Sequence, residues 1–332
     1  MDQIAALEWL QSNVEALGGD PDNITIFGES AGGGSVNVMM TSKITEGLFD
    51  KAIVMSGGGR RGFLTDNSLE RAEAAGADFA AWAGIRGDDP DALSALRDLP
   101  AETVVRGTGM GTMFFGPKEG DPPPTSGPVA DGELLVLDYQ SAYEAGAFHQ
   151  VPFMAGANTA DLGFPSPDPF AKFGDRADLA RTVYEADYGN DPKALSAAVA
   201  MDAMMIEPAR FTVEKVAATG QPAWHYRAGY VPTSMRDEWN GLPHAAEIPF
   251  FFKTIEDRYP GETSTDDKFM SSMMNQYFVN FATTGNPNGG GLPEWPAYDK
   301  ETKPVMMFDA EGPQGGDDPW RQRLDLTADA AE

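Results

Sequence analysis

Hydrophobic residues near the N-terminus recur three and four positions apart, which predicts an amphipathic helix over residues 2–17. The apolar side chains on this face are Ile4, Leu7, Leu10, Val14 and Leu17. Gly18 and Gly19 follow directly. Glycine commonly ends a helix because it adopts left-handed backbone angles without strain. The chain therefore opens with a helix, and a short turn separates that helix from the next element.

Four later apolar segments predict β-strands. They cover residues 23–27, 51–56, 151–156 and 222–230. The second is continuously apolar, as in parallel strands that are buried on both faces, whereas the fourth alternates Trp224, Tyr226 and Ala228. Helical patterns separate the strands, including one over 265–284. This alternation indicates an α/β fold with a mainly parallel sheet of about four or five strands.

Two long segments without a strand interrupt this alternation, over residues 57–127 and 168–219, and we interpret them as helical excursions that form a cap. The last segment, 312–332, is acidic and at first rich in Gly and Pro, so we expect it to pack weakly. No repeat and no linker divides the chain. We therefore expect a single domain over residues 1–332.

Composition narrows the classes of function. The formal net charge is −27, which disfavours nucleic acid and anionic membranes as partners and favours solubility. Cysteine is absent, which excludes disulfides, thiolate metal sites and cysteine nucleophiles. The sequence as given has no basic-then-apolar leader and no apolar run long enough to span a bilayer, so it reads as cytoplasmic as given, and the native compartment stays unknown.

The strand-like run 23–27 leads into Gly28-Glu29-Ser30-Ala31-Gly32 and then into a helical pattern. A strand, a sharp turn and a helix with serine at the apex form a nucleophile elbow, in which strain lifts the serine oxygen clear of the sheet. The N–H of Ala31, at the helix N-terminus, would then face negative charge that develops beside that oxygen. The pentapeptide alone is common, but its flanks favour Ser30 as a nucleophile.

A neutral serine needs a base to take its proton, and a carboxylate to orient that base and stabilise its charged form. The chain has three histidines. His225 lies inside a predicted strand and His149 precedes one, whereas His244 lies in a loop that leaves the last predicted strand. The loop 156–163 offers Asp161, with Asp168 as the alternative. The order serine, acid, histidine is that of the α/β-hydrolases, and this chemistry requires no metal and no organic cofactor.

Other residues have weaker indications. Glu29 adjoins the nucleophile and either tunes the site or forms a hydrogen-bonded turn. Phe164, Phe250 and Phe251 lie near the expected site in the sequence. They either line an acyl or alcohol pocket or pack in the core, and core packing is the commoner fate of such residues.

Several ordered motifs resemble the type B carboxylesterase family, which includes the cholinesterases and bacterial p-nitrobenzyl esterases. The resemblance covers residues 2 to about 308. Its motifs are DQIAALEW at 2–9, FGESAGG at 27–33, PVADG at 128–132, the loop 156–161, His244 with Glu247, GNPNG at 285–289 and LPEWP at 292–296.

The resemblance implies an α/β-hydrolase fold and a serine esterase that hydrolyses small-molecule carboxylic esters through an acyl-serine intermediate. It implies Ser30 as nucleophile, His244 as general base and Asp161 as triad acid, with Ser56 hydrogen-bonded to that acid. Most of the family has Glu at the acid position, one methylene longer than Asp161. The glycine that follows the acid is also displaced by one residue here.

The family also has a long segment before the position of Asp2, which supplies the first strands and two of three oxyanion-hole donors. We therefore expect an N-terminally truncated fold in which Ala31 is the assigned donor. The run 57–59 either supplies further N–H groups or is an ordinary glycine loop. An exposed edge at the strand 23–27 predicts a homo-oligomer. The alternative function is a weakly active or non-catalytic esterase-like binding protein.

Overall fold

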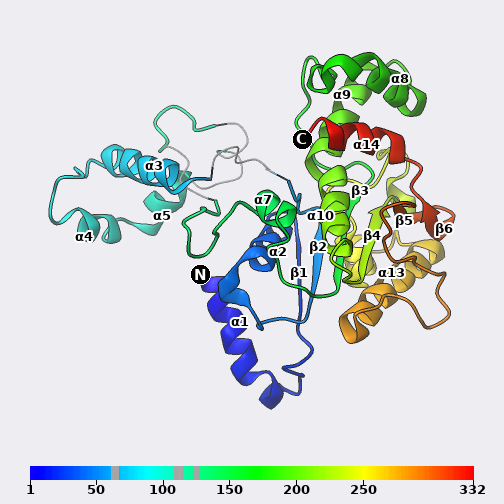
Figure 1. Ribbon diagram of the computed structural model, residues 1–332, viewed down its shortest axis with the longest axis horizontal. Helices are drawn as coiled ribbons and strands as arrows, with labels where there is room; N and C mark the ends of the chain where they lie inside the picture. Colours follow the sequence, from blue (N-terminus) through cyan, green and yellow to red (C-terminus); the bar gives the residue numbers. More distant parts are fainter. Residues whose placement is uncertain (61–66, 108–111, 113–115, 123–126) are drawn as a thin grey trace. The chain divides into compact units, whose positions relative to one another are not determined.

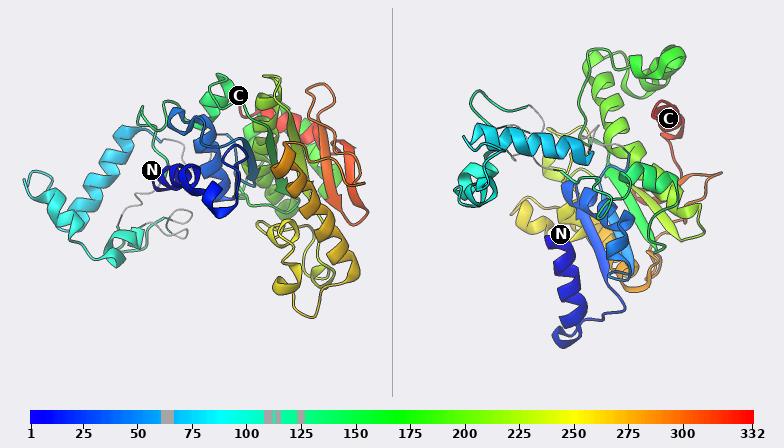
Figure 2. Two further views of the ribbon diagram at one scale, coloured as in Figure 1. Left: turned by 90° about the horizontal axis from the view of Figure 1, so that it is seen from below. Right: turned by 60° about the vertical axis from the view of Figure 1, so that its left-hand side comes forward.

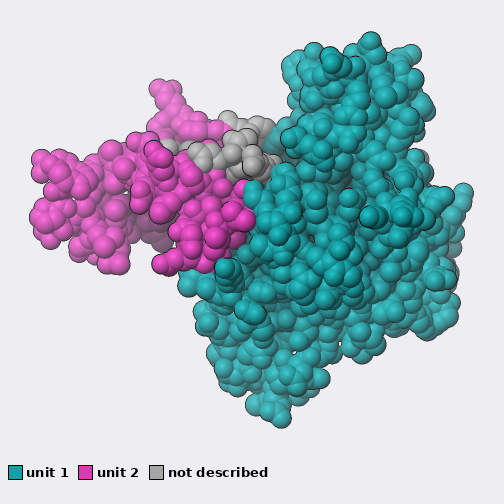
Figure 3. Space-filling model, viewed as in Figure 1, with its two compact units in different colours: residues 1–62, 139–332 teal, residues 63–138 magenta. Residues whose placement is uncertain are grey.

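The computed structural model describes residues 1–60, 67–107, 112, 116–122 and 127–332. Part of the expected excursion 57–127 lies outside these residues. The chain divides into two compact units, which Figure 3 colours separately. One unit joins residues 1–62 to 139–332, and the other is 63–138.

A six-stranded sheet forms the centre of the first unit (Figure 1). Its strands are β1 (Thr25–Glu29), β2 (Lys51–Met55), β3 (Phe153–Asn158), β4 (Ala223–Ala228), β5 (Pro304–Asp309) and β6 (Gly312–Asp317). They pair in chain order, in parallel from β1 to β5 and antiparallel between β5 and β6. The predicted α/β fold with a mainly parallel sheet is confirmed. The sheet has six strands rather than four or five, and neither β5 nor β6 was predicted from the sequence.

Helices α2, α7 and α10 lie on one face of the sheet. They span Ala31–Thr41, Tyr139–Glu144 and Glu207–Ala217. Val36 and Met40 of α2 and Val213 of α10 are buried there against Val54 and Ala155 of the strands. The first helix, α1 (Asp2–Asn13), adds Leu7 to the same cluster and continues into the short 3₁₀ helix η1 (Glu15–Leu17). These helices thus shield one face of the apolar parallel strands from solvent.

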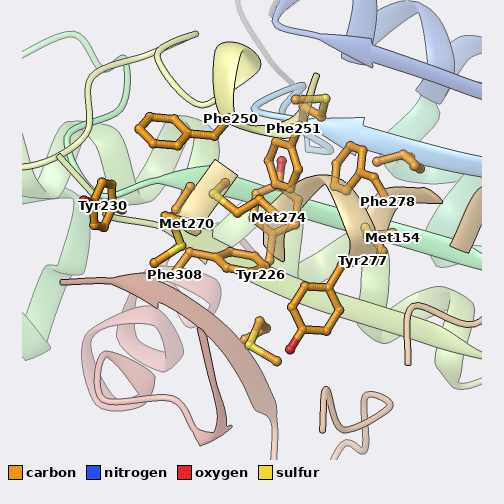
Figure 4. Close-up of a cluster of buried hydrophobic side chains, with 14 of the residues drawn as sticks. Met154, Tyr226, Tyr230, Phe250, Phe251, Met270, Met274, Tyr277, Phe278 and Phe308 are labelled. Atoms are coloured by element: carbon orange, nitrogen blue, oxygen red, sulfur yellow. The ribbon is translucent and has the colours of Figure 1, made fainter. Parts of the chain in front are cut away.

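The opposite face is covered by α11 (Ile248–Phe251) and α13 (Thr265–Thr284). Helix α13 begins with a capping box between Ser264 and Asp267, which satisfies two free N–H groups of the first turn. Aromatic and methionine side chains fill this cluster, and Figure 4 shows Tyr226 of β4 among Phe251, Phe278 and Phe308. The alternation of Trp224, Tyr226 and Ala228 along β4 directs all three into it.

A third apolar cluster joins the second excursion to the C-terminal segment (Figure 2). Its elements are η4 (Ala171–Arg176), α8 (Ala177–Tyr188), α9 (Pro192–Met201), the π-helical turn η5 (Asp202–Ile206) and α14 (Arg321–Asp329). The segment 312–332 therefore differs from the expectation of weak packing. It forms β6 and α14, and Leu324 and Leu326 are buried.

The described residues of the second unit include the helices α3 (Leu69–Trp82), α4 (Ala92–Arg97) and α5 (Ala101–Val104) and the 3₁₀ helix η3 (Val105–Gly107). Within it, the Trp82 indole donates to the carbonyl of Gly120 at 3.1 Å. No described residue of this unit belongs to the sheet, as expected of a helical excursion. Across the described parts of the chain, no helix combines the length and the apolar character needed to cross a membrane.

Candidate active site

Ser30 lies between β1 and α2 with φ 56° and ψ −119°, a strained conformation for a residue with a side chain. Its N–H donates to the carbonyl of Met55 at 2.9 Å, which holds the turn against β2. Close packing explains the neighbouring glycines. A Cβ on Gly28 would lie 2.3 Å from the backbone of Gly32, and one on Gly33 would lie 2.6 Å from Gly57. The sequence 28–33 thus folds into the predicted elbow.

Asp161 lies in the loop after β3, and both oxygens of its carboxylate form hydrogen bonds. Oδ2 accepts from the Ser56 hydroxyl at 2.6 Å and from the N–H of Asn158 at 2.8 Å. Oδ1 accepts from the N–H of Leu162 at 2.7 Å and lies 2.5 Å from His244 Nδ1. The Asp161 side chain has no exposed surface. Its charge is therefore fixed in place beside the imidazole.

His244 connects the acid to the serine. Its Nε2 lies 2.8 Å from Ser30 Oγ, while Nδ1 faces Asp161. The structure thus brings together Ser30, Asp161 and His244 from three loops at the carboxyl ends of β1, β3 and β4, the edge of an α/β sheet where ligands bind. The aspartate at the acid position therefore reaches the histidine.

Electrostatics at the site favour a charged imidazole. Burial alone lowers the pKa of His244, but the hydrogen bond and charge of Asp161, with the charge of Glu29 adding, outweigh it and raise the pKa. Glu29 Oε1 lies 3.3 Å from His244 Nε2, and burial raises the Glu29 pKa, with His244 opposing the shift and Asp161 reinforcing it. Burial likewise raises the pKa of Glu247 to about 8.

The remaining predicted residues lie in different surroundings. Ala31 is exposed at the N-terminus of α2, next to Ser30. Phe250 and Phe251 are 0% and 1% exposed and pack in the core, with the Phe251 ring stacked on Phe278 at 3.7 Å. Phe164 is exposed on the acid loop.

The alternative acid Asp168 is exposed, and its main-chain N–H donates a hydrogen bond to Ser166 Oγ. The other two histidines lie away from the serine. His225 is buried in β4, where its Nδ1 forms a hydrogen bond with the carbonyl of Ala155. His149 Nε2 forms a hydrogen bond with the carbonyl of Ser42 at the end of α2. Among the described residues, no group of three or more acidic or histidine side chains is placed to hold a metal ion.

The glycine run 57–59 packs between helices α2 and α10. A Cβ on Gly57 would lie 2.6 Å from Gly33, and one on Gly59 would lie 2.5 Å from the Pro208 carbonyl oxygen. The carbonyl of Gly57 accepts from the Asn37 side chain. Gly57 and Gly59 are thus required for close packing of the helices against the loop after β2.

Sequence reasoning missed Asn158, the last residue of β3. Its N–H holds Asp161, and its side-chain Nδ2 donates to the Pro243 carbonyl at 2.7 Å and to the Glu247 carboxyl. The available signal was position, because a polar residue that ends a buried strand needs partners. Glu247 was noted in a motif without a role, and it is fully buried.

Comparison with known proteins gives a consistent result. The family model described as the carboxylesterase family matches residues 1–192 and 176–325. The cocaine esterase of Homo sapiens is 30% identical over 92% of this chain and 58% of its own length. The para-nitrobenzyl esterase of Bacillus subtilis is 30% identical over 94% of this chain and 63% of its own length. The chain therefore spans less than two thirds of either relative.

A solved structure of a PNB esterase is also similar. It superposes with a TM-score of 0.78 at 25% sequence identity, over 98% of this chain and 67% of that chain.

Proposed function

The chain belongs to the carboxylesterase family, and from this premise we propose that it hydrolyses carboxylic esters through an acyl-Ser30 intermediate. The 2.8 Å contact between His244 Nε2 and Ser30 Oγ, with Asp161 on the opposite nitrogen, carries the proposal. Relatives named cocaine esterase and para-nitrobenzyl esterase support the reaction class.

In the proposed reaction, Ser30 Oγ attacks the ester carbonyl carbon while His244 Nε2 takes its proton. The oxyanion of the tetrahedral intermediate accepts a hydrogen bond from the N–H of Ala31, at the positive end of the α2 dipole. His244 then returns the proton to the leaving alkoxide, and the C–O bond breaks to leave acyl-Ser30. Water deprotonated by His244 attacks the acyl carbon and releases the acid, and the proton returns to Ser30.

Asp161 has two roles in this proposal. It fixes the imidazole so that Nε2 faces the serine, and it stabilises the imidazolium that forms during each attack. Its four hydrogen-bonding contacts, including that from Ser56, keep the carboxylate from turning away.

The test compares p-nitrophenyl butyrate hydrolysis by the parent chain and by Ser30→Ala, together with labelling by a fluorophosphonate. We expect turnover and labelling in the parent and neither in Ser30→Ala. Labelling without turnover would favour a weakly active protein that lacks sufficient oxyanion donors. Loss of both in the parent would overturn the proposal and favour a binding role.

A further inference from the structure

The loops that carry Asp161 and His244 are joined by a short ladder of contacts. Ala160 and Pro243 form an isolated parallel bridge, in which the N–H of Ala160 donates to the Leu242 carbonyl at 3.0 Å. The N–H of Leu242 donates to Thr159 Oγ1 at 3.0 Å. The position of the imidazole relative to its carboxylate therefore depends on how these loops are held together.

Asn158 is placed at the end of this ladder and contacts both loops. Through its N–H it holds Asp161 Oδ2, and through Nδ2 it holds the carbonyl of Pro243, the residue before His244. The same Nδ2 donates to Glu247 Oε2. Asn158 is 0% exposed. One residue thus links the acid of the site, through its main chain, to the two ends of the histidine loop, through its side chain.

Two polar atoms of this contact have no hydrogen-bond partner among the described residues, Asn158 Oδ1 and Glu247 Oε1. Both atoms are acceptors when Glu247 is ionised, and unpartnered buried acceptors are costly. They belong to the two groups already joined through Nδ2 and Oε2. A proton on Glu247 Oε1 would supply the missing donor, and donation from it to Asn158 Oδ1 would satisfy both atoms.

We propose that Asn158 is a positioning residue whose amide pairs with the protonated carboxyl of Glu247, and that this neutral pair fixes the His244 loop against the Asp161 loop. The proposal rests on the proposed function for its catalytic meaning. Its structural content, a neutral acid–amide pair that holds the imidazole beside Asp161, rests on the contacts and burial of the two side chains and does not depend on turnover.

The surroundings of Glu247 agree with a neutral carboxyl. Burial raises its pKa to about 8, the hydrogen bond from Asn158 opposes the shift, and the charges of Asp161 and Glu29 add to it. Tyr226, packed in the adjacent core, and His244 also face this carboxyl. A second ionised carboxylate beside Asp161 and Glu29 would be repelled by both.

The experiment uses selective isotope labelling of histidine and an NMR titration of His244 in the full chain, with kcat and KM for p-nitrophenyl butyrate as the second readout. In Asn158→Ala the main-chain N–H to Asp161 remains and only the link to the histidine loop is lost. We expect the His244 pKa to fall by about one unit and kcat to fall about 30-fold, with KM within about twofold.

Glu247→Gln tests the charge state of the pair, because glutamine keeps the shape and can still donate to Asn158 Oδ1. We expect both the acid dissociation constant of His244 and kcat to stay within about twofold of their values in the parent. An ionised Glu247 predicts instead a His244 pKa lower by about one unit in this variant, which would overturn the neutral pair.

Asn288→Ala is the matched control. Its side chain also pins a loop, through hydrogen bonds to both the N–H and the carbonyl of Trp295. We expect lower stability with an unchanged His244 pKa. If Asn158→Ala does not fold, Asn158→Ser removes the same contact with a smaller polar side chain.

A His244 pKa in the Asn158 variant equal to that of the parent would overturn the positioning role. The titration needs no turnover, so an inactive parent would refute the proposed function while leaving this test of the acid–amide pair intact.

Discussion

Arg227 and Asp318 form a two-pronged ion pair in which neither side chain is exposed, with Nη1 to Oδ1 at 2.8 Å and Nη2 to Oδ2 at 2.9 Å. The Trp320 ring contacts two guanidinium groups, with its centroid 4.2 Å from Cζ of Arg227 and 3.6 Å from Cζ of Arg323. Arg323 in turn pairs with the buried Asp202 at 2.8 Å. These contacts attach the C-terminal segment to β4 and to the π-helical turn.

Asp318→Asn should lower the free energy of unfolding by about 3 kcal/mol, because it leaves a buried guanidinium without a countercharge. Burial raises the pKa of Asp318, but the charge and hydrogen bonds of Arg227 outweigh burial and hold it well below the usual 3.8. The stabilisation is therefore present above about pH 4 and is lost as pH falls further. Urea unfolding measures it, and the exposed Asp317→Asn is the control. Equal midpoints for the two variants would contradict this reading.

His225 should make stability fall as the solution becomes moderately acidic. Burial, with the nearby Arg227, lowers the His225 pKa from 6.5 to about 3, so the unfolded chain binds a proton that the folded chain does not. Stability is complete above pH 6.5 and declines below it, by about 2 kcal/mol between pH 6.5 and 5. His225→Leu should flatten this slope in urea titrations at the two pH values. An unchanged slope would show that His225 is not responsible.

Asp161→Asn should lower kcat for p-nitrophenyl butyrate by about 10³- to 10⁴-fold, because an amide no longer stabilises the imidazolium or its tautomer. KM should change little. The matched control is Asp168→Asn, on the same loop but exposed, which should retain parent activity. If Asp168→Asn produced the larger loss, the assignment of the acid would be wrong.

Glu29→Gln should move the acid limb of the kcat/KM profile to lower pH by about half a unit. Hydrolysis requires neutral His244, and the Glu29 carboxylate helps to raise the His244 pKa. Removing the charge keeps the imidazole neutral at lower pH. A rate profile across pH 5 to 9 checks the shift, and a limb that stays in place or moves to higher pH would contradict it.

The edge of the sheet at β1 should promote self-association. Among the described strands β1 pairs on one side only, and Phe27 on this strand is 53% exposed. Unpaired strand edges with apolar side chains associate readily. We expect a dimer or larger assembly by light scattering at micromolar concentration and dissociation in Phe27→Lys. A clean monomer of the parent would refute the prediction.

Local patterns were enough to predict the elements that surround the site. The helix predicted over 265–284 corresponds to α13, and Gly285 ends it with left-handed angles as glycine commonly does. The strand before Ser30 and the helix after it are both present. These features depend on residues close together in the chain, which is why periodicity and turn residues suffice to find them.

Other features depend on partners far away in the chain. Strand β6 has the sequence GPQGGD, which carries no strand pattern, and it is a strand because it pairs with β5 across a tight turn. The C-terminal segment is held by the ion pair of Asp318 with Arg227, which lies 91 residues earlier in the chain. Asn158 was missed for the same reason, because its partners Pro243 and Glu247 lie 85 and 89 residues away.

The strand order of the sheet equals the order of the strands along the chain. During synthesis, each of β2 to β5 can therefore join a neighbour that has already left the ribosome, and no strand must wait for insertion between two later ones. The imidazole of His244 follows β4, while the pair between Arg227 and Asp318 forms only after β6 has emerged. A nascent chain halted after α13 would already contain Ser30, Asp161 and His244 and the three strands that position them. Asp318, the ion-pair partner of Arg227, would not yet have been synthesised.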